Sequence, residues 1–225
     1  TLSPSRISNF RTCPLQFRFA SIEKLPQPPQ IHLVKGNFVH RVLELLLGNE
    51  PEHRTVEAAR QAFDKTRAEY EPSARFKALG LSPDASEAFF KDSRELVNGY
   101  YRMENPRNAK IIGLELRLDS DFGKFKLGGI IDRLEYNEKN ELVVSDYKTG
   151  KVPDARFGAN KMDNMHIYAS LCLRERGELP KRLRLMYLKS STPIEVEVTP
   201  ESNAACESAA IETFDQIDAS CQSGQ

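Results

Sequence analysis

The chain has 225 residues, of which 40% are hydrophobic and 28% are charged. This length and composition are typical of one globular domain with a sizeable core, and they exclude a disordered chain. Lysine and arginine together number 32, as do aspartate and glutamate, so the net charge neither favours nor excludes a nucleic-acid partner. No apolar run approaches the roughly 20 residues of a membrane span, and the N-terminus lacks a secretory signal. We therefore expect a cytoplasmic protein that makes no membrane contact.

The first half of the chain has the apolar periodicity of helices. A serine–proline pair near its start predicts a short helix that ends near Cys13. The proline-rich residues 24–33 predict a loop. Residues 36–48, GNFVHRVLELLLG, repeat apolar side chains at helical spacing and predict an amphipathic helix. Two further helices are expected over residues 55–70 and 84–103, joined by a flexible connection.

From Lys110 onward the apolar period changes to two residues, which predicts strands. Three consecutive strands are expected over residues 111–118, 125–136 and 141–148. They are followed by a helix over 160–176, two strands around 182–188 and 194–200, and a last helix that begins at Pro200 and runs to about 220. The chain is therefore expected to combine a helical part, 1–109, with a sheet part, 110–225.

Alternation fixes the register of the hairpin formed by residues 128–150, GGIIDRLEYNEKNELVVSDYKTG. Leu134 and Val144 must face the core together, and they do so if they lie opposite each other. This pairing needs a loop of odd length, such as residues 138–140 with Asn140 in the left-handed conformation. The pattern thus predicts both the register and the turn.

The same register places Asp132 directly opposite Asp146, with Lys148 one step along on the same face. Two carboxylates and an ammonium group are thus expected to converge at the end of an apolar face. Like charges so close are costly unless a cation bridges them, and carboxylate oxygens suit Mg²⁺ or Mn²⁺. A metal there would support phosphodiester hydrolysis, with Lys148 positioning the attacking water or stabilising the pentacovalent state. The alternative is a structural Asp–Lys ion pair at a hairpin end.

These residues resemble those of a known family. Asp132, followed by the segment DYKTG from Asp146 to Gly150, is similar to the split PD-(D/E)XK signature of RecB-type nucleases, in which GxxDR precedes a DYKTG strand. The resemblance extends to three other segments and so covers nearly the whole chain: GNFVHRVLE, GLELRL and SRISNFRTCPLQFRF. It implies one restriction-endonuclease-like α/β domain over residues 1–225, with a central mixed β-sheet flanked by helices. The helical part then carries a metal-ligand histidine, and the sheet part carries the catalytic hairpin and a DNA-contacting helix.

The resemblance also implies roles for single residues. His40 would be interpreted as a surface histidine from its helix alone, and the resemblance makes it a metal ligand. Lys148 is the expected catalytic lysine, and Glu115 is expected to orient the metal or its water. The implied ligands of the cation, Mg²⁺ or Mn²⁺, are His40, Asp132, Asp146 and the carbonyl oxygen of Tyr147.

After the catalytic strand, the family has a helix with the pattern Q-x-x-x-Y, which contacts DNA near the scissile phosphate. This chain has Asn164 in place of the glutamine and Tyr168 in place of the tyrosine, with Lys161 one turn before Asn164 on the same side. Asparagine keeps the hydrogen-bonding groups of glutamine but reaches less far. The alternative is that Met165, Tyr168 and Cys172 are core residues of this helix.

Arg133 directly follows Asp132 and has two interpretations. Its guanidinium contacts a DNA phosphate, or it pairs with Glu135 or Glu141. The sequence does not decide between them.

The opening R-T-C-P resembles the segment of RecB-like and AddB-like nucleases that supplies the first cysteine, here Cys13, of a four-cysteine iron–sulfur cluster. The other three ligands in the family come from a C-terminal tail with C-x-x-C spacing. Cys172, Cys206 and Cys221 lack that spacing, so we expect these 225 residues to bind no cluster. Cys13 is then a free thiol or an orphaned ligand, and a longer native chain would complete a 4Fe-4S cluster with cysteines beyond Gln225. The alternative is that Cys13 is a buried apolar residue.

Together these features predict a metal-dependent deoxyribonuclease, a RecB-type exonuclease that acts on DNA ends or single strands in repair or recombination. No G-x-x-x-x-G-K-[ST] loop occurs in the sequence, so ATP-driven unwinding would require a helicase partner. Two alternatives are a catalytically silent DNA-binding or scaffold domain of a helicase–nuclease complex, and an RNA nuclease. The intact Asp132, Asp146 and Lys148 favour an active enzyme over the silent domain.

Overall fold

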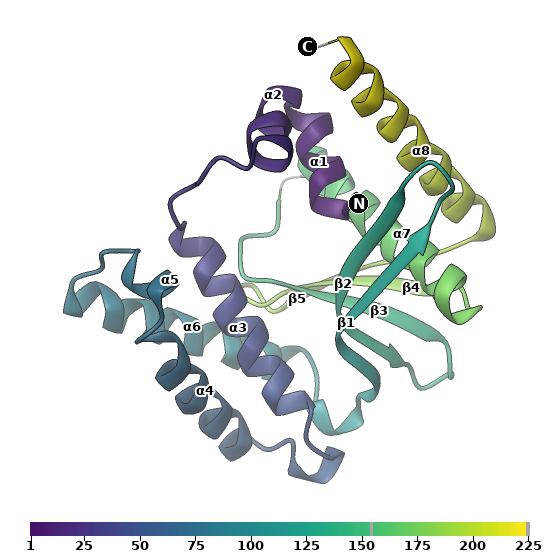
Figure 1. The fold of residues 1–225 in the computed structure, drawn as a ribbon. Coiled ribbons are helices and arrows are strands. Elements are labelled where there is room, and N and C mark those ends of the chain that lie inside the picture. Colours follow the sequence, from purple (N-terminus) through teal and green to yellow (C-terminus); the bar gives the residue numbers. More distant parts are fainter. Residues whose placement is uncertain (154, 224–225) are drawn as a thin grey trace.

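The structure is a computed structural model, and it describes residues 1–153 and 155–223, without the side chains of 155–161. Its centre is a five-stranded sheet whose strands lie side by side in chain order (Figure 1). The strands are β1 (Lys110–Asp121), β2 (Lys126–Tyr136), β3 (Leu142–Lys148), β4 (Arg182–Tyr187) and β5 (Thr192–Glu197). The β3–β4 pair is parallel and the other three pairs are antiparallel. The predicted α/β class with a central mixed sheet is confirmed.

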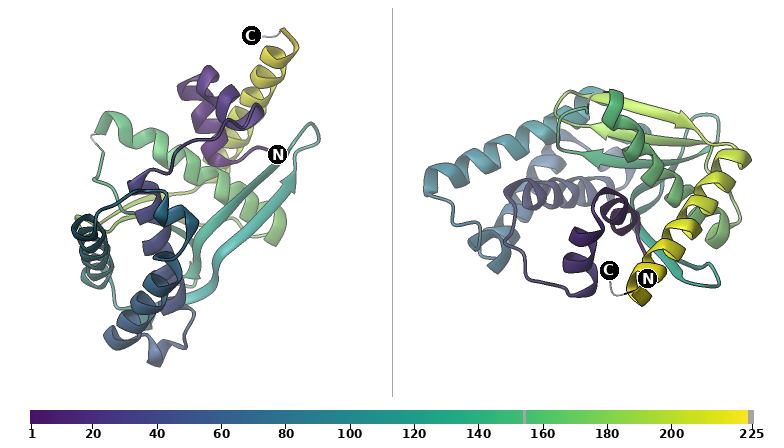
Figure 2. Two further views of the ribbon diagram at one scale, coloured as in Figure 1. Left: turned by 60° about the vertical axis from the view of Figure 1, so that its left-hand side comes forward. Right: turned by 90° about the horizontal axis from the view of Figure 1, so that it is seen from above.

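Helices pack on both sides of this sheet (Figures 1 and 2). One group consists of α1 (Pro4–Thr12), α2 (Pro14–Phe17), α7 (Ala155–Arg176) and α8 (Pro200–Ser223). The other consists of α3 (Ile31–Leu47), α4 (Val56–Tyr70), α5 (Ala74–Lys77) and α6 (Pro83–Met103). Short π- and 3₁₀-helical segments cover Arg18–Ile22, Pro51–His53 and Pro106–Asn108. In the described part of the chain, no helix has the length and hydropathy needed to cross a bilayer.

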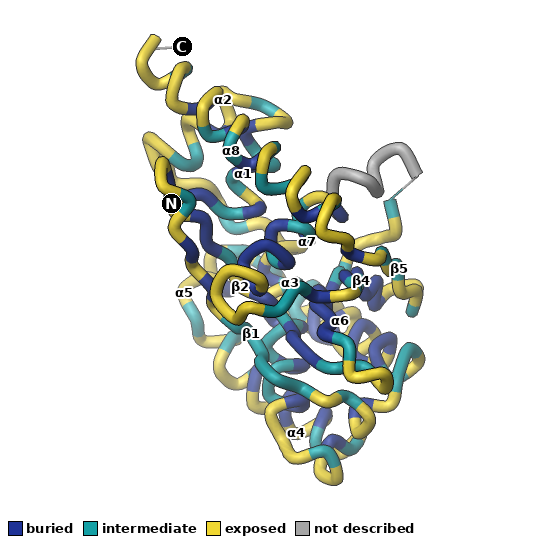
Figure 3. Tube along the Cα trace, turned by 90° about the vertical axis from the view of Figure 1, so that its right-hand side faces the viewer, coloured by how far each residue is buried: buried dark blue, intermediate teal, exposed yellow. Residues whose placement is uncertain are grey.

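Two apolar cores lie on opposite sides of the sheet, because side chains alternate along its strands. Leu134 and Val144 belong to the core that α1, α7 and α8 cover, whereas Tyr147 and Met186 belong to the core of α3 to α6. Buried residues gather where the helices meet the strands, and the far end of α8 is exposed (Figure 3). Because α3 buries its apolar side chains in the second core, it presents His40 toward the sheet.

The β2–β3 hairpin has the predicted register. Leu134 pairs with Val144. The backbone N–H of Asn137 donates to the carbonyl of Glu141 at 3.0 Å, which closes a loop of three residues. Within that loop, Asn140 has a φ of 57°. The predicted odd loop with a left-handed Asn140 is therefore confirmed.

Two predicted connections contain helix instead. The loop expected over residues 24–33 is shorter, because α3 begins at Ile31. The flexible connection expected between residues 70 and 84 holds α5, whose Phe76 is buried and stacks on Phe90 with 5.3 Å between ring centroids. Four residues are too few to show helical periodicity in a sequence, and packing of Phe76 stabilises this turn.

Candidate active site

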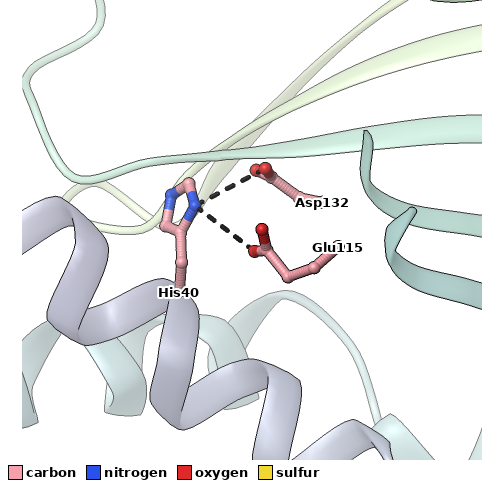
Figure 4. A group of neighbouring side chains, drawn as sticks. All are labelled: His40, Glu115 and Asp132. Carbon is pink, nitrogen blue, oxygen red and sulfur yellow. Dashed lines mark ion pairs between the residues drawn. The ribbon is translucent and has the colours of Figure 1, made fainter. Parts of the chain in front are cut away.

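Three side chains with metal-binding atoms meet where α3 passes the sheet (Figure 4). His40 comes from α3, Glu115 from β1 and Asp132 from β2, and one ligand atom of each lies within 4.8 Å of the others. His40 Nδ1 is 3.5 Å from Asp132 Oδ1 and 4.0 Å from Glu115 Oε1. All three residues are half-buried, so the fold both supports them and leaves them open to a ligand.

Glu115 reaches this cluster at an irregular point of β1. Its φ is 45°, in the left-handed region that residues other than glycine rarely adopt. Side chains two residues apart on a regular strand share a face, yet Leu114 packs in the α3–α6 core and Leu116 in the α1–α7–α8 core. The regular alternation of side chains between the two faces of β1 is therefore interrupted at Glu115. Backbone strain of this kind persists only where the surroundings hold it, and it is concentrated at functional sites.

The backbone of Tyr147 connects two members of the cluster. Its N–H donates to Asp132 Oδ2 at 2.7 Å, and its carbonyl oxygen lies 2.9 Å from His40 Nε2. Because a carbonyl can only accept a hydrogen bond, Nε2 carries the proton, and Nδ1 is the nitrogen that faces the two carboxylates. In this structure the Tyr147 carbonyl thus orients the imidazole, and its predicted role as a metal ligand stays a prediction.

The strand β3 contributes the acid and the lysine expected to converge with Asp132. Cross-strand pairing of Arg133 with Ser145 places Asp132 and Asp146 at neighbouring positions. Asp146 is buried, and its Oδ2 lies 2.5 Å from Lys148 Nζ. The ion pair that was the structural alternative is therefore present, and it lies beside the cluster of His40, Glu115 and Asp132 rather than alone.

Crowded acids shift the pKa values in this site. Burial and the neighbouring Asp132 raise the pKa of Glu115 to about 7. Burial and Asp132 also raise the pKa of Asp146 to about 6, against the opposing effect of Lys148. Burial lowers the pKa of His40, but Asp132 and Asp146 outweigh it and raise that pKa to about 9. Acidic groups that favour protonation near neutral pH mark a place where a cation would be stabilising.

This donor set fits a divalent cation. It offers the imidazole of His40 and the carboxylates of Glu115 and Asp132, with Asp146 beside them. Carboxylate oxygens suit Mg²⁺ and Mn²⁺, and Mn²⁺ also accepts an imidazole nitrogen. The fold thus brings together two of the predicted ligands, His40 and Asp132, and adds Glu115 to them.

Arg133 does not face the site, and its predicted contact with a DNA phosphate is wrong for this structure. Its side chain is fully buried and forms ion pairs with Glu104 and Glu135. Pairing with Glu135 was one of the alternatives, and Glu141 is not among its partners. Adjacent residues of a strand point to opposite faces, so Arg133 faces away where Asp132 faces the cluster.

The helix α7 carries the other residues predicted to contact DNA. The ring of Tyr168 packs on Gly129 of β2 so closely that a β-carbon at Gly129 would lie 2.7 Å from Tyr168 Cε1. Asn164 is partly exposed on this helix, and the side chain of Lys161 lies outside the described residues. The core residues of the helix include Met165 and Cys172. DNA contact by Asn164, Tyr168 and Lys161 stays a prediction.

Two of the cysteines line one cavity. Cys13 and Cys221 both border an open, mostly apolar space of about 610 Å³ between the α1–α2 segment and the end of α8. Cys172 is buried, as its position on a core face predicts. That these 225 residues bind no iron–sulfur cluster stays a prediction. The structure adds that Cys13 lies near the end of the C-terminal helix.

Sequence analysis offers the Arg133–Glu135 pair but misses the larger charged network to which this pair belongs. Glu104 follows α6, and Arg184 lies on β4, and both join Arg133 and Glu135 of β2 in one network. Arg133 and Glu135 share a face of their strand, which was the available signal. No spacing in the sequence connects them to Glu104 or Arg184, because those contacts depend on tertiary packing.

Known proteins resemble this chain in family and fold. A family model described as "PD-(D/E)XK nuclease superfamily" matches residues 1–222. The crystal structure of a "Putative exonuclease" from Eubacterium rectale covers 96% of this chain and 79% of its own, with a TM-score of 0.63 and 11% sequence identity. The crystal structure of SSO0001 covers 82% of this chain and 84% of its own, with 17% identity and a TM-score of 0.39. No curated protein matches the chain. The family match confirms the predicted restriction-endonuclease-like fold.

Proposed function

The chain belongs to the PD-(D/E)XK nuclease superfamily, and on that premise we propose that it is a metal-dependent deoxyribonuclease. The proposed reaction is hydrolysis of phosphodiester bonds at DNA ends or in single strands, as in RecB-type exonucleases. One observation carries this proposal: His40, Glu115 and Asp132 converge beside the Asp146–Lys148 pair. A structural ion pair alone would not require three further ionisable groups at the same place.

Each residue of the cluster would contribute to binding a cation in its own way. When bound, a divalent cation would supply Lewis-acid stabilisation of phosphate charge and lower the pKa of a bound water. His40 and Asp132 would hold it, because the Tyr147 backbone already orients both side chains. Glu115 would add a further negative oxygen, held by the local turn of β1.

Lys148 supplies positive charge on the side open to substrate. Its side chain is 33% exposed, against 12% for its partner Asp146, so Lys148 is the more accessible member of the pair. Burial opposes the charged form, but Asp146 and Asp132 outweigh it and raise the pKa of Lys148. Lys148 therefore stays protonated, and it orients water and stabilises negative charge rather than accepting a proton.

The finer parts of the proposal rest on the sequence motifs. The histidine helix, GGIIDR and DYKTG follow one another in the order found in RecB-type nucleases, which supports that class, and the fold neighbour is described as a "Putative exonuclease". DNA would lie along α7, near Asn164 and Tyr168. We extend the proposal to a role in DNA repair or recombination, with a helicase partner supplying any unwinding.

Incubation of the purified chain with end-labelled single-stranded, double-stranded and circular DNA tests this proposal. We expect linear DNA to be degraded with Mg²⁺ or Mn²⁺, circles to remain intact, and EDTA to abolish the reaction. Lys148→Ala should degrade linear DNA far more slowly in the same assay. Lys139→Ala is the matched control, because Lys139 is an exposed lysine in the loop of the same hairpin.

Two outcomes would contradict the proposal and support one of its rivals. Cleavage of RNA without cleavage of DNA would identify an RNA nuclease. DNA binding without cleavage, with either cation, would identify a silent DNA-binding or scaffold domain.

A further inference from the structure

The network around Arg133 is centred on the residue that follows Asp132 in β2. The Arg133 side chain is 0% exposed. Its Nη2 donates to Glu104 Oε2 at 3.1 Å and to Glu135 Oε1 at 2.8 Å. Its Nη1 donates to the Tyr100 hydroxyl at 3.1 Å. Because a buried guanidinium is costly without such partners, this arrangement is held in one geometry.

The same guanidinium packs against the ring of Tyr147. Its central carbon lies 5.8 Å from the Tyr147 ring centroid, and the Tyr100 ring stands edge-on to Tyr147 with 6.0 Å between centroids. The Tyr147 ring is buried, and its hydroxyl has no hydrogen-bond partner within the described residues. Packing against Arg133 and Tyr100 therefore fixes the orientation of this ring.

Tyr147 is also the residue whose backbone N–H holds Asp132 and whose carbonyl holds His40. We propose that Arg133 is a positioning residue for the metal site, which acts through the Tyr147 ring and through its own place next to Asp132 on β2. This inference rests on the proposed function, because it gives Arg133 a role in binding a cation at His40 and Asp132. With a purely structural role, Arg133 would contribute to folding and not to metal affinity.

An arginine suits this position because its planar fork can bond two carboxylates while its face packs on an aromatic ring. Arg184 closes the network on its more exposed side, 3.4 Å from Glu135 and 3.5 Å from Glu104. Two arginines thus balance two carboxylates. Since Glu104 follows α6 and Arg184 lies on β4, the network joins rigid elements to the strand that carries Asp132, as a preorganised site requires.

Two neighbouring tyrosines of α6 provide a matched test. Tyr100→Phe removes the hydroxyl that Arg133 contacts, whereas Tyr101→Phe removes a hydroxyl that donates to the Thr55 carbonyl at 2.8 Å, outside the network. Mn²⁺ affinity can be measured by calorimetry, with thermal unfolding of the same samples. We expect Tyr100→Phe to weaken Mn²⁺ binding about threefold, below the 10–100-fold typical of losing a supporting side chain. Tyr101→Phe should bind Mn²⁺ as the wild type does.

The arginines provide a second pair with a larger expected effect. Arg133→Lys keeps the positive charge but loses the planar fork, and we expect Mn²⁺ affinity to fall about tenfold. Arg54→Lys is its control, because Arg54 is also buried and donates to backbone carbonyls, including that of Ala109 at 2.8 Å. It should lower thermal stability and leave Mn²⁺ affinity unchanged. If Arg133→Lys does not fold, the tyrosine pair decides the question.

Wild-type Mn²⁺ affinity in Tyr100→Phe and in folded Arg133→Lys would overturn the inference and leave the proposed function intact. An equal loss of affinity in the Tyr101 and Arg54 controls would also overturn it, because the effect would then follow stability. If the wild-type chain shows no Mn²⁺ binding that depends on Asp132, the proposed metal site fails, and this inference fails with it.

Discussion

Two charged regions meet at β2, the first around Arg133 and the second around Asp132, and a glutamate in each shows how they differ. Burial raises the pKa of Glu104, but Arg133 outweighs it, so the pKa of this carboxyl is lowered overall. Burial raises the pKa of Glu115 as well, and there Asp132 adds to the effect, so the pKa reaches about 7. The first region balances its charges within the protein, and the second does not. The sign of the shift therefore separates a structural network from a site that a cation would stabilise.

The largest effect that separates the two regions should come from removing Asp132 from the second region. We expect Asp132→Ala to slow DNA cleavage by more than about 10³-fold, because loss of one charge-stabilising group costs roughly 10²–10³ in rate and this residue also holds the cation. Lys148→Ala should cost roughly 10²–10³, since it leaves the cation cluster in place. Single-turnover cleavage of end-labelled DNA measures both rates. A wild-type rate in either variant would show that the active site lies elsewhere.

The balanced region should instead determine stability. Arg133→Met leaves Glu104 and Glu135 with Arg184 as their remaining partner, so that one negative charge is uncompensated. Because Glu135 is buried, this should lower the free energy of unfolding by about 3–5 kcal/mol. The double variant Arg133→Met with Glu135→Gln should recover part of that loss, because one uncompensated charge is removed. Urea denaturation of the two variants gives the comparison. A loss below about 1 kcal/mol for Arg133→Met would mean that this network contributes no more than an exposed ion pair.

A histidine pair on α3 sharpens the comparison for metal binding. His40→Ala should lower Mn²⁺ affinity by at least about 10-fold, the lower end of what loss of a supporting side chain costs. His32→Ala is the matched control, because His32 is exposed near the start of the same helix. Calorimetric titration with Mn²⁺ measures both. Equal affinities for the two variants would remove His40 from the set of ligands.

The smallest expected effect is on the pH dependence of stability. The pKa values of Glu115 and His40 in the folded chain, about 7 and about 9, lie above their ordinary values of 4.5 and 6.5. The folded chain therefore binds more protons than the unfolded chain between these limits. The free energy of unfolding of the metal-free chain should fall as the pH rises from about 4.5 to about 9. Mn²⁺ should remove most of that slope, because the cation takes the place of the protons.

Glu115→Gln tests this pH dependence. The variant should lose the part of the slope that lies between about pH 4.5 and pH 7, and it should be more stable than the wild type at pH 8. Glu138→Gln, at an exposed position in the β2–β3 loop, should behave as the wild type does. Thermal unfolding in EDTA across this pH range provides the data. An unchanged slope in Glu115→Gln would show that the Glu115 carboxyl is not the group whose raised pKa makes stability depend on pH.

The hairpin shows how much of the site can be predicted from sequence. The alternation of Leu134 and Val144 determines the register, and Asn140 determines the turn, so the structure has both as predicted. The neighbouring positions of Asp132 and Asp146 follow directly, because register is a local property of two strands joined by a short loop.

Glu115 and Arg133 show where sequence reasoning ends. Glu115 joins the cluster because its positive φ interrupts the alternation of side chains along β1. No residue type in the strand predicts such a conformation. The Arg133 side chain is bound by Glu104, which is 29 residues away in the chain and reaches Arg133 through the packing of α6. Sequence alternation places Arg133 on a face, but tertiary packing supplies its partner.

The position of Mn²⁺ in crystals of this chain, located by anomalous scattering, tests the central claim most directly. A second cavity also has several carboxylates in its lining, among them Glu135, Glu141 and Glu195. Arg182 and Arg184 line the same cavity and supply positive charge there. We expect an ion in contact with His40 and Asp132 and no ion in that cavity. An ion in the arginine-lined cavity, or no ion at His40 and Asp132, would contradict the assignment of the metal site.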